Sequence, residues 1–180
     1  MQIRCALVGM PGSGKSTVGR QLAHRAGVPF IDLDHRLEQT LGTNIRSFFE
    51  AEGEARFRDI ESQVLADVAR QPGGMVLSTG GGAVLRPENR EVLRQFGNVL
   101  YLRASPEEIF KRVKHDKTRP LLQGGNPMDK LRDLYAQRDH LYRETAHYVI
   151  ETGRPSVHTL VNMVMMQLEM AESAGGAGSH

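Results

Sequence analysis

Gly9-Met-Pro-Gly-Ser-Gly-Lys15-Ser16-Thr17 is the stretch that decides the fold of this chain. It fits the pattern G-x-x-x-x-G-K-[ST], in which glycines bring backbone N–H groups up to phosphate oxygens. In this pattern the ammonium group of Lys15 meets the outer phosphates, and the hydroxyl of Ser16 suits a magnesium ion. A helix that begins here also points its positive end at the phosphates. The stretch therefore predicts a P-loop that binds a nucleoside triphosphate.

The sequence on either side of the loop supports this interpretation. Residues 3–8 form an apolar run typical of a buried strand, and residues 18–26 have apolar positions at helical spacing. Strand, loop and helix thus follow in the order that the motif requires. We therefore prefer a P-loop to the alternative, a glycine-rich turn that binds nothing.

Strands alternate with helices along the rest of the chain. Apolar runs predict four more strands, at 28–31, 75–78, 98–102 and 147–150. Helical patterns predict helices at 35–41, 45–50, 52–70, 87–96, from 106 onward behind a Ser105–Glu108 capping box, 128–143 and 155–170. The alternation predicts an α/β fold: a three-layer α/β/α sandwich with a central parallel five-stranded sheet, like that of nucleoside monophosphate kinases.

Length and composition indicate one domain. The chain has 180 residues, of which 39% are hydrophobic and 24% charged, with a formal net charge of +2. We expect a single P-loop domain over residues 1–170, a lid at about 114–127 and a flexible tail at 171–180. In the last helix, apolar side chains are expected to pack in the core: Leu160, Met163, Met166 and Leu168.

Several function classes find no support in the sequence. The small net charge does not argue for nucleic acid or for a membrane surface, and no apolar run approaches a membrane span. The single cysteine, Cys5, excludes an intrachain disulfide and is expected to be buried, and the seven histidines lack a zinc-site spacing. Because the P-loop begins at residue 9, we expect no signal peptide and a cytoplasmic protein.

Polar residues follow two of the predicted strands. Asp32 and Asp34 could serve magnesium through water and accept a proton from a substrate hydroxyl, or one of them could simply cap the next helix. Gly80–Gly82 would let a ligand approach the backbone closely, although three glycines could also form a plain tight turn. Because this strand ends in Ser-Thr-Gly without an acidic residue, Asp32 is the better candidate for magnesium.

Arginines supply the remaining candidates. Arg58 could recognise an anion or form a surface ion pair with Glu61, three residues further along the helix. Arg119 lies in a polar segment that we expect to close as a lid over the transferring phosphoryl group, because aromatic residues for a nucleic-acid site are absent. Arg138, on the following helix, could return to the same cleft. Three arginines around one cleft suggest an anionic acceptor.

Six stretches together resemble the shikimate kinase family, in the family's order and spacing from residue 3 to about residue 155. They are the P-loop, Asp32-Leu-Asp34, Phe57-Arg58-Asp59-Ile60-Glu61, Gly80-Gly81-Gly82, Asp116-Lys-Thr-Arg119-Pro-Leu-Leu122 and Leu134-x-x-x-Arg138-x-x-x-Tyr142-x-Glu144-x-Ala146. The resemblance implies ATP-dependent phosphorylation of the 3-hydroxyl of shikimate, a step toward chorismate and the aromatic amino acids.

The resemblance also implies a role for each matching residue. Lys15, Asp34 and Arg119 would be catalytic, with Asp34 as the base. Shikimate would be bound by Asp34, Arg58, Gly80, Gly81, Gly82 and Arg138. ATP would be bound by Gly12, Ser13, Gly14, Lys15, Ser16, Thr17, Arg112, Arg119 and Pro155. Magnesium would be held by Ser16 and Asp32.

Two other functions were weighed against this one. Another metabolite kinase, such as a gluconate kinase, would share the fold, but Arg138 and the three glycines favour shikimate. A GTP-dependent switch would carry an Asn-Lys-x-Asp stretch, which the chain lacks. We expect a monomer whose partners are shikimate and ATP, with no nucleic acid and no membrane.

Overall fold

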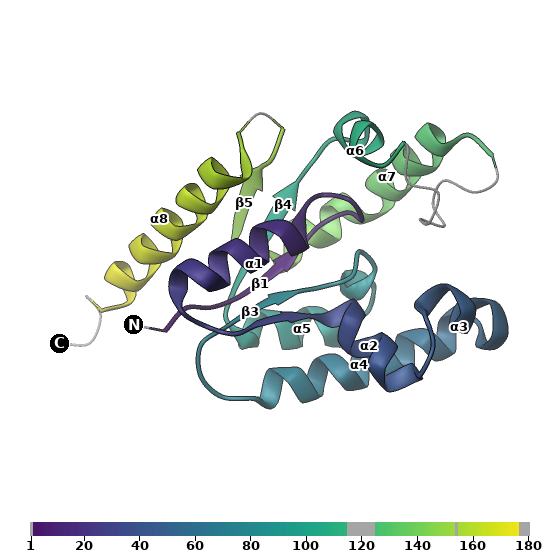
Figure 1. Cartoon of the computed structure of the whole chain (residues 1–180), viewed down its shortest axis with the longest axis horizontal. Coiled ribbons are helices and arrows are strands. Elements are labelled where there is room, and N and C mark those ends of the chain that lie inside the picture. Colours follow the sequence, from purple (N-terminus) through teal and green to yellow (C-terminus); the bar gives the residue numbers. More distant parts are fainter. Residues whose placement is uncertain (1, 115–124, 154, 177–180) are drawn as a thin grey trace.

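One parallel sheet forms the centre of the molecule (Figure 1). The structure is a computed structural model that describes residues 2–114, 125–153 and 155–176. In these ranges five strands lie in the order β2-β3-β1-β4-β5. Their bounds are β1 Arg4–Val8, β2 Phe30–Asp32, β3 Met75–Ser78, β4 Asn98–Arg103 and β5 Tyr148–Glu151. The sheet confirms the predicted α/β fold.

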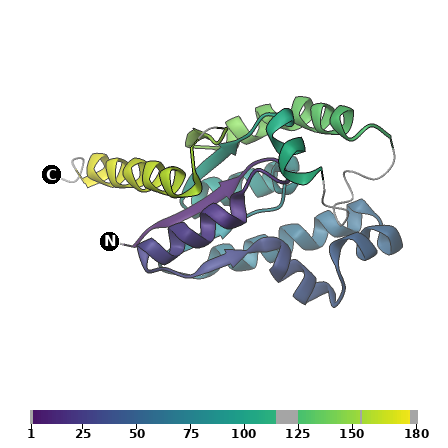
Figure 2. The ribbon, with the colours of Figure 1, turned by 45° about the horizontal axis from the view of Figure 1, so that its top comes forward.

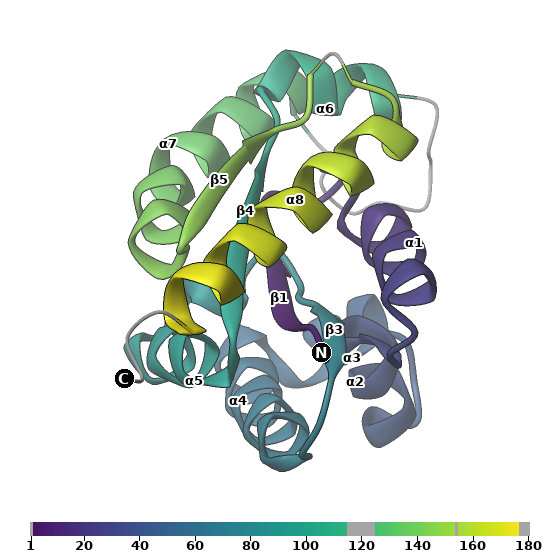
Figure 3. The ribbon, with the colours of Figure 1, turned by 90° about the vertical axis from the view of Figure 1, so that its left-hand side faces the viewer.

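Helices cover both faces of the sheet. Their bounds are α1 Lys15–Ala26, α2 Leu33–Leu41, α3 Ile45–Glu52, α4 Glu54–Arg70, the short 3-10 helix η1 Ala83–Leu85, α5 Pro87–Phe96, α6 Pro106–Val113, α7 Pro127–Thr145 and α8 Val157–Gly176. Figure 3 shows α1 and α8 on one face, with α4, α5 and α7 on the other. In Figure 2, α2 and α3 project beyond the sheet beside α4. The three predicted layers are therefore present.

The central strand shows why these residues form a buried sheet. Residues 5–8 of β1 are fully buried, with β3 on one side and β4 on the other. Cys5 and Leu7 point into the core under α1 and α8, whereas Ala6 and Val8 point into the opposite core. A strand that is covered on both faces needs apolar residues at every position, which explains the continuous apolar run. Cys5 is buried as expected.

Arg4 connects three chain segments at the end of the sheet opposite the P-loop. Its guanidinium donates hydrogen bonds of 2.8 Å to the carbonyl oxygens of Ala69, Gly73 and Phe96. The first and last of these lie at the ends of α4 and α5, where carbonyl groups lack partners inside the helix. Arg4 also lies over the ring of Phe96, with its Cζ 4.0 Å from the centroid.

The last helix corrects two predictions. It runs from Val157 to Gly176, so the predicted end at residue 170 is wrong. Alanine favours helix, and the alanines after residue 170 allow the helix to continue. Leu160 and Leu168 are buried as expected, but Met163 and Met166 are exposed. Only one side of α8 faces the sheet, and these two methionines lie on the other. The remaining residues of the predicted flexible tail, 177–180, are outside the described ranges.

Other element boundaries shift by a few residues. The first helix begins at Lys15 and not at residue 18, and the second strand spans Phe30–Asp32 and not 28–31. The short η1 after the three glycines was not predicted from the sequence. None of the helices in the described ranges is long and apolar enough to pass through a bilayer.

Candidate active site

The P-loop joins β1 to α1 and curls around a lysine. Gly12 and Gly14 have φ angles of +82° and +94°, which favour glycine, and Gly14 caps α1. Lys15 is only 7% exposed. Its Nζ donates hydrogen bonds of 2.8 Å to the carbonyl oxygens of Gly9 and Met10. The loop therefore holds the lysine ammonium group along its inner side, at the positive end of α1.

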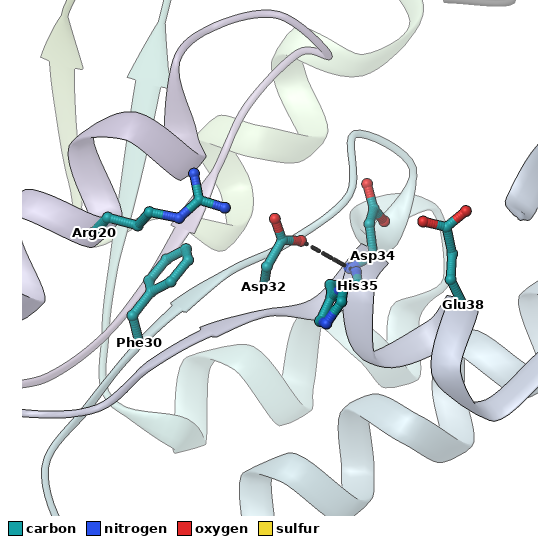
Figure 4. A pocket seen from close by; sticks show the side chains of 6 residues that line it. All are labelled: Arg20, Phe30, Asp32, Asp34, His35 and Glu38. Atoms are coloured by element: carbon teal, nitrogen blue, oxygen red, sulfur yellow. Dashed lines mark hydrogen bonds between the residues drawn. The ribbon is translucent and has the colours of Figure 1, made fainter.

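Ser16 and Asp32 meet where the P-loop approaches the end of β2. The Ser16 hydroxyl donates to Oδ2 of Asp32 over 3.1 Å. The other oxygen, Oδ1, accepts hydrogen bonds from the backbone N–H groups of Asp34 and His35 at 3.0 and 3.4 Å, and so caps α2 (Figure 4). The capping alternative is thus correct for Asp32. It does not exclude the other role, because the second oxygen faces the P-loop.

Asp34 is a largely enclosed acid beside the P-loop. Burial raises the pKa of its carboxyl above the usual range, and the nearby Asp32 and Glu38 carboxylates raise it further. The charges of Lys15 and Arg58 act in the opposite direction. A carboxyl group held in such surroundings is suited to proton transfer.

The three glycines after β3 face the side chains of the site at very short range. A Cβ atom added to Gly80 would lie 2.7 Å from Oδ1 of Asp34. One added to Gly81 would lie 3.2 Å from Nη1 of Arg138. The backbone of Gly80–Gly82 is therefore in direct contact with charged side chains from α2 and α7. A plain tight turn does not require this, so the glycines also make room for these protein side chains.

Arg58, on α4, is held by two carboxylates of different exposure. Its Nη1 lies 3.0 Å from Oε1 of Glu61, whose side chain is 1% exposed, and its Nη2 lies 3.4 Å from Oε1 of Glu54, which is 60% exposed. Burial raises the pKa of Glu61, whereas the charge of Arg58 and the hydrogen bond from it lower that pKa. The pair with Glu61 is buried, so the surface ion-pair interpretation is wrong for this contact.

The Arg58 guanidinium also has a fixed orientation. Its Cζ lies 5.2 Å from the ring centroid of Phe57 and 5.8 Å from that of Phe49. A Cβ added to Gly82 would overlap the guanidinium, so the glycine turn limits it on a third side. Among the described residues, its buried Nε has no hydrogen-bond partner. The guanidinium of Arg58 is therefore held in one orientation at the glycine turn, where it can donate hydrogen bonds.

Arg112 reaches the P-loop from α6. Its Nη1 donates to the carbonyl oxygen of Ser13 over 3.0 Å, and its Nη2 donates to that of Thr152 over 3.3 Å. Thr152 directly follows β5, so Arg112 connects the P-loop with the segment that leads to α8. Pro155 lies in that same segment. Thr17 is exposed in the first turn of α1. Arg119, the expected lid arginine, is outside the described residues.

A hollow of about 420 Å³ opens beside the two aspartates. It is lined by Arg20, Phe30, Asp32, Asp34, His35 and Glu38 (Figure 4). The Cζ atom of Arg20 lies 5.3 Å from the ring centroid of Phe30, on the α1 side of the hollow. Arg20, Phe30, His35 and Glu38 were not among the residues predicted from the sequence. Arg20 comes from α1, and only the fold places it next to Asp32.

The structure therefore brings most of the predicted residues together at the carboxyl ends of β1, β2 and β3. Glu61 was considered only as a surface partner of Arg58, and its spacing of three residues was the available signal. Its burial could not be predicted from that spacing. Tyr142 belongs to one of the six stretches, but no role was predicted for it.

Comparison with known proteins covers almost the whole chain. The sequence model of the shikimate kinase family matches residues 11–169. Shikimate kinase of Paracidovorax citrulli (strain AAC00-1) is 57% identical over 173 residues, which are 94% of this chain and 94% of the relative.

Solved structures agree with the sequence comparison. Shikimate kinase from Acinetobacter baumannii, solved in complex with shikimate, superimposes with a TM-score of 0.87 at 44% identity, over 94% of each chain. A gluconokinase from Sinorhizobium meliloti 1021 has a TM-score of 0.62 at 17% identity, over 99% of this chain and 98% of that one. The second likeness shows a shared fold alone.

Proposed function

The chain belongs to the shikimate kinase family, and from this premise we propose how its residues divide the phosphorylation of shikimate by ATP. Membership in the family makes the protein a kinase of the shikimate pathway that uses ATP. The observation that carries the assignment of residues is the convergence of Asp34, Arg58 and Arg138 on the glycine turn next to the P-loop.

Arg58 and Arg138 hold the carboxylate of shikimate. Arg58 is supported by its orientation between two phenylalanine rings, and by a buried Nε that lacks a partner among the described residues. Arg138 is supported by the position of its Nη1, which would lie 3.2 Å from a Cβ atom added to Gly81. A planar guanidinium can donate two parallel hydrogen bonds to a carboxylate. Because Glu61 already offsets the positive charge of Arg58, the second arginine supplies the charge that balances the substrate carboxylate. The backbone of Gly80–Gly82 then lies along the substrate.

Asp34 binds the hydroxyl groups of shikimate and accepts the proton of the hydroxyl that is phosphorylated. Its raised pKa, caused by burial, makes it a stronger base than an exposed aspartate, while the charge of Lys15 favours the carboxylate form. The transfer itself needs little covalent help from the protein. Alignment of the acceptor oxygen with the γ-phosphorus and neutralisation of charge supply most of the catalysis.

Lys15 and the N-terminus of α1 bind the phosphates of ATP, together with the backbone of Gly12 to Thr17. Ser16 and Asp32 would hold magnesium. These two side chains offer hard oxygen atoms 3.1 Å apart, which suits an ion that prefers few protein ligands and completes its shell with phosphate and water. When bound, magnesium would offset the negative charge of the phosphates.

Other assignments follow the family. Arg112 and Pro155 flank the adenine, supported by the contact of Arg112 with both the P-loop and the segment that contains Pro155. Arg119 acts from the lid at about 114–127. We further propose one domain over residues 1–170, a monomeric enzyme and, because the reaction consumes ATP, a cytoplasmic location.

The test is ADP release by the purified protein with ATP and magnesium, in parallel with shikimate, with gluconate and without an acceptor. We expect turnover that depends on shikimate. Gluconate-dependent turnover would overturn the acceptor site but not the P-loop. ATP binding without turnover on either acceptor would favour a regulatory binder.

A further inference from the structure

Tyr142 is a buried polar residue that the mechanism above leaves without a role. Its side chain is 0% exposed, and its hydroxyl donates a hydrogen bond of 2.6 Å to the carbonyl oxygen of Gly81. Tyr142 follows Arg138 by four residues on α7, so the two side chains lie on the same side of the helix. The hydroxyl therefore connects the helix that carries Arg138 with the glycine turn.

Arg138 lies at the same peptide. Its Nη1 would be 3.2 Å from a Cβ atom added to Gly81, whose carbonyl oxygen accepts from Tyr142. Burial raises the pKa of Tyr142 to about 12, whereas the charge of Arg138 and a side-chain hydrogen bond with it lower that pKa. A phenol can donate one hydrogen bond and accept another, so the hydroxyl that donates to Gly81 is able to accept from Arg138.

Gly81 is fixed on its other side by the P-loop. A Cβ added to Gly81 would lie 2.6 Å from Cδ of Pro11 and 3.2 Å from Nη1 of Arg138. Gly81 therefore fills the space between the P-loop and the arginine. Loss of the hydroxyl that holds its carbonyl would therefore release the peptide that Arg138 faces.

We propose that Tyr142 is a positioning residue for shikimate, which sets the guanidinium of Arg138 against the Gly81 peptide through its hydroxyl group. This rests on the proposed role of Arg138 in holding the substrate carboxylate. The phenol does not touch the reacting atoms. It fixes the orientation of the Arg138 guanidinium. A rotated guanidinium loses one of its two parallel hydrogen bonds to the substrate carboxylate.

A merely structural role is the alternative, and a second tyrosine provides the control. Tyr101 packs against Tyr142 with ring centroids 5.0 Å apart, and its hydroxyl donates to Oδ1 of Asp139 on α7 over 2.8 Å. Tyr101→Phe therefore removes a buried hydroxyl from the same aromatic pair and loosens the same helix. It leaves the contacts of Gly81 and Arg138 intact.

The experiment measures KM for shikimate, KM for ATP, kcat and thermal melting for Tyr142→Phe and Tyr101→Phe. For Tyr142→Phe we expect KM for shikimate to rise about tenfold, with KM for ATP unchanged and kcat within about threefold of the wild type. Tyr101→Phe should lower the melting temperature at least as much but leave KM for shikimate within about twofold. Equal changes in both variants, or a rise in both KM values, would overturn the proposal.

A double-mutant cycle separates this proposal from the one on which it rests. If Tyr142 acts through Arg138, Tyr142→Phe adds no further increase in KM for shikimate to that of Arg138→Ala. Additive increases would refute the positioning role. If Arg138→Ala leaves shikimate binding unchanged, the proposed role of Arg138 fails, and that of Tyr142 fails with it. If Arg138→Ala raises KM but Tyr142→Phe does not, only the inference about Tyr142 fails.

Discussion

Alanine substitutions at Gly80 and Gly82 should separate catalysis from substrate binding. Neither glycine has a positive φ, so the backbone tolerates alanine at both positions. The added methyl group of Gly82→Ala would lie 2.5 Å from Cζ of Arg58, and that of Gly80→Ala 2.7 Å from Oδ1 of Asp34. Ordinary contact begins at 3.4 Å, so the Asp34 carboxylate must move by roughly 0.7 Å and the Arg58 guanidinium by at least roughly 0.9 Å.

The two displacements affect different steps. Arg58 cannot move freely, because Glu61 and two phenylalanine rings hold it. A misplaced fork loses a charged hydrogen bond worth about 1.5–3 kcal/mol, so KM for shikimate should rise about 10- to 150-fold in Gly82→Ala. A shift of Asp34 mainly misaligns the base, so kcat should fall about 100-fold in Gly80→Ala.

Steady-state kinetics with shikimate as the varied substrate, together with melting temperatures, measure these effects. Gly175→Ala is the matched control, because a Cβ at Gly175 meets nothing within 4 Å. It should leave KM and kcat at wild-type values. The reasoning fails if Gly82→Ala keeps a wild-type KM for shikimate, or if the two site variants change KM and kcat in the same proportions.

Three further predictions concern single residues. Asp34→Asn should lower kcat at least about 100-fold while ATP binding, measured by calorimetry, stays normal. Because burial raises the pKa of Asp34, its charged form costs stability in the folded state; the Asn variant should therefore melt higher at pH 7, and this gain should disappear below about pH 4, where the carboxyl is protonated in both states. Arg58→Lys keeps the charge but loses the fork, so KM for shikimate should rise at least about tenfold, and an unchanged KM would contradict carboxylate binding. Arg4→Met removes three hydrogen bonds to carbonyl groups and should lower the free energy of unfolding by roughly 2 kcal/mol in urea titrations, with kcat unaltered at 25 °C.

The parts of the site that were predicted well depend on neighbouring residues. The P-loop needs only its own glycines, the strand before it and the helix after it. Asp32 is the last residue of the strand that brings it to the P-loop, and its role as a helix cap was one of two alternatives. Such features follow from local geometry, so a short stretch of sequence contains the information.

Contacts between distant segments were harder to predict. The spacing of Arg58 and Glu61 indicates a pair, but the burial of Glu61 depends on how α4 packs against the sheet. The contact of Tyr142 with Gly81 joins residues 61 positions apart, and no local pattern signals it. The exposed Met163 shows the same limit, because α8 has apolar residues on both its buried and its exposed side, and their spacing then does not say which side faces the core.

The sequence by itself determined the P-loop, the alternation of strands and helices, and the family, because these depend on residue types at short and regular spacing. Only the tertiary structure decided why three glycines follow β3. Asp34, Arg138 and Arg58 come from α2, α7 and α4 and meet the backbone at those positions. Packing of helices on a parallel sheet brings these segments together. A side chain at Gly80 or Gly82 would occupy the same space as a charged group, and one at Gly81 would overlap Pro11.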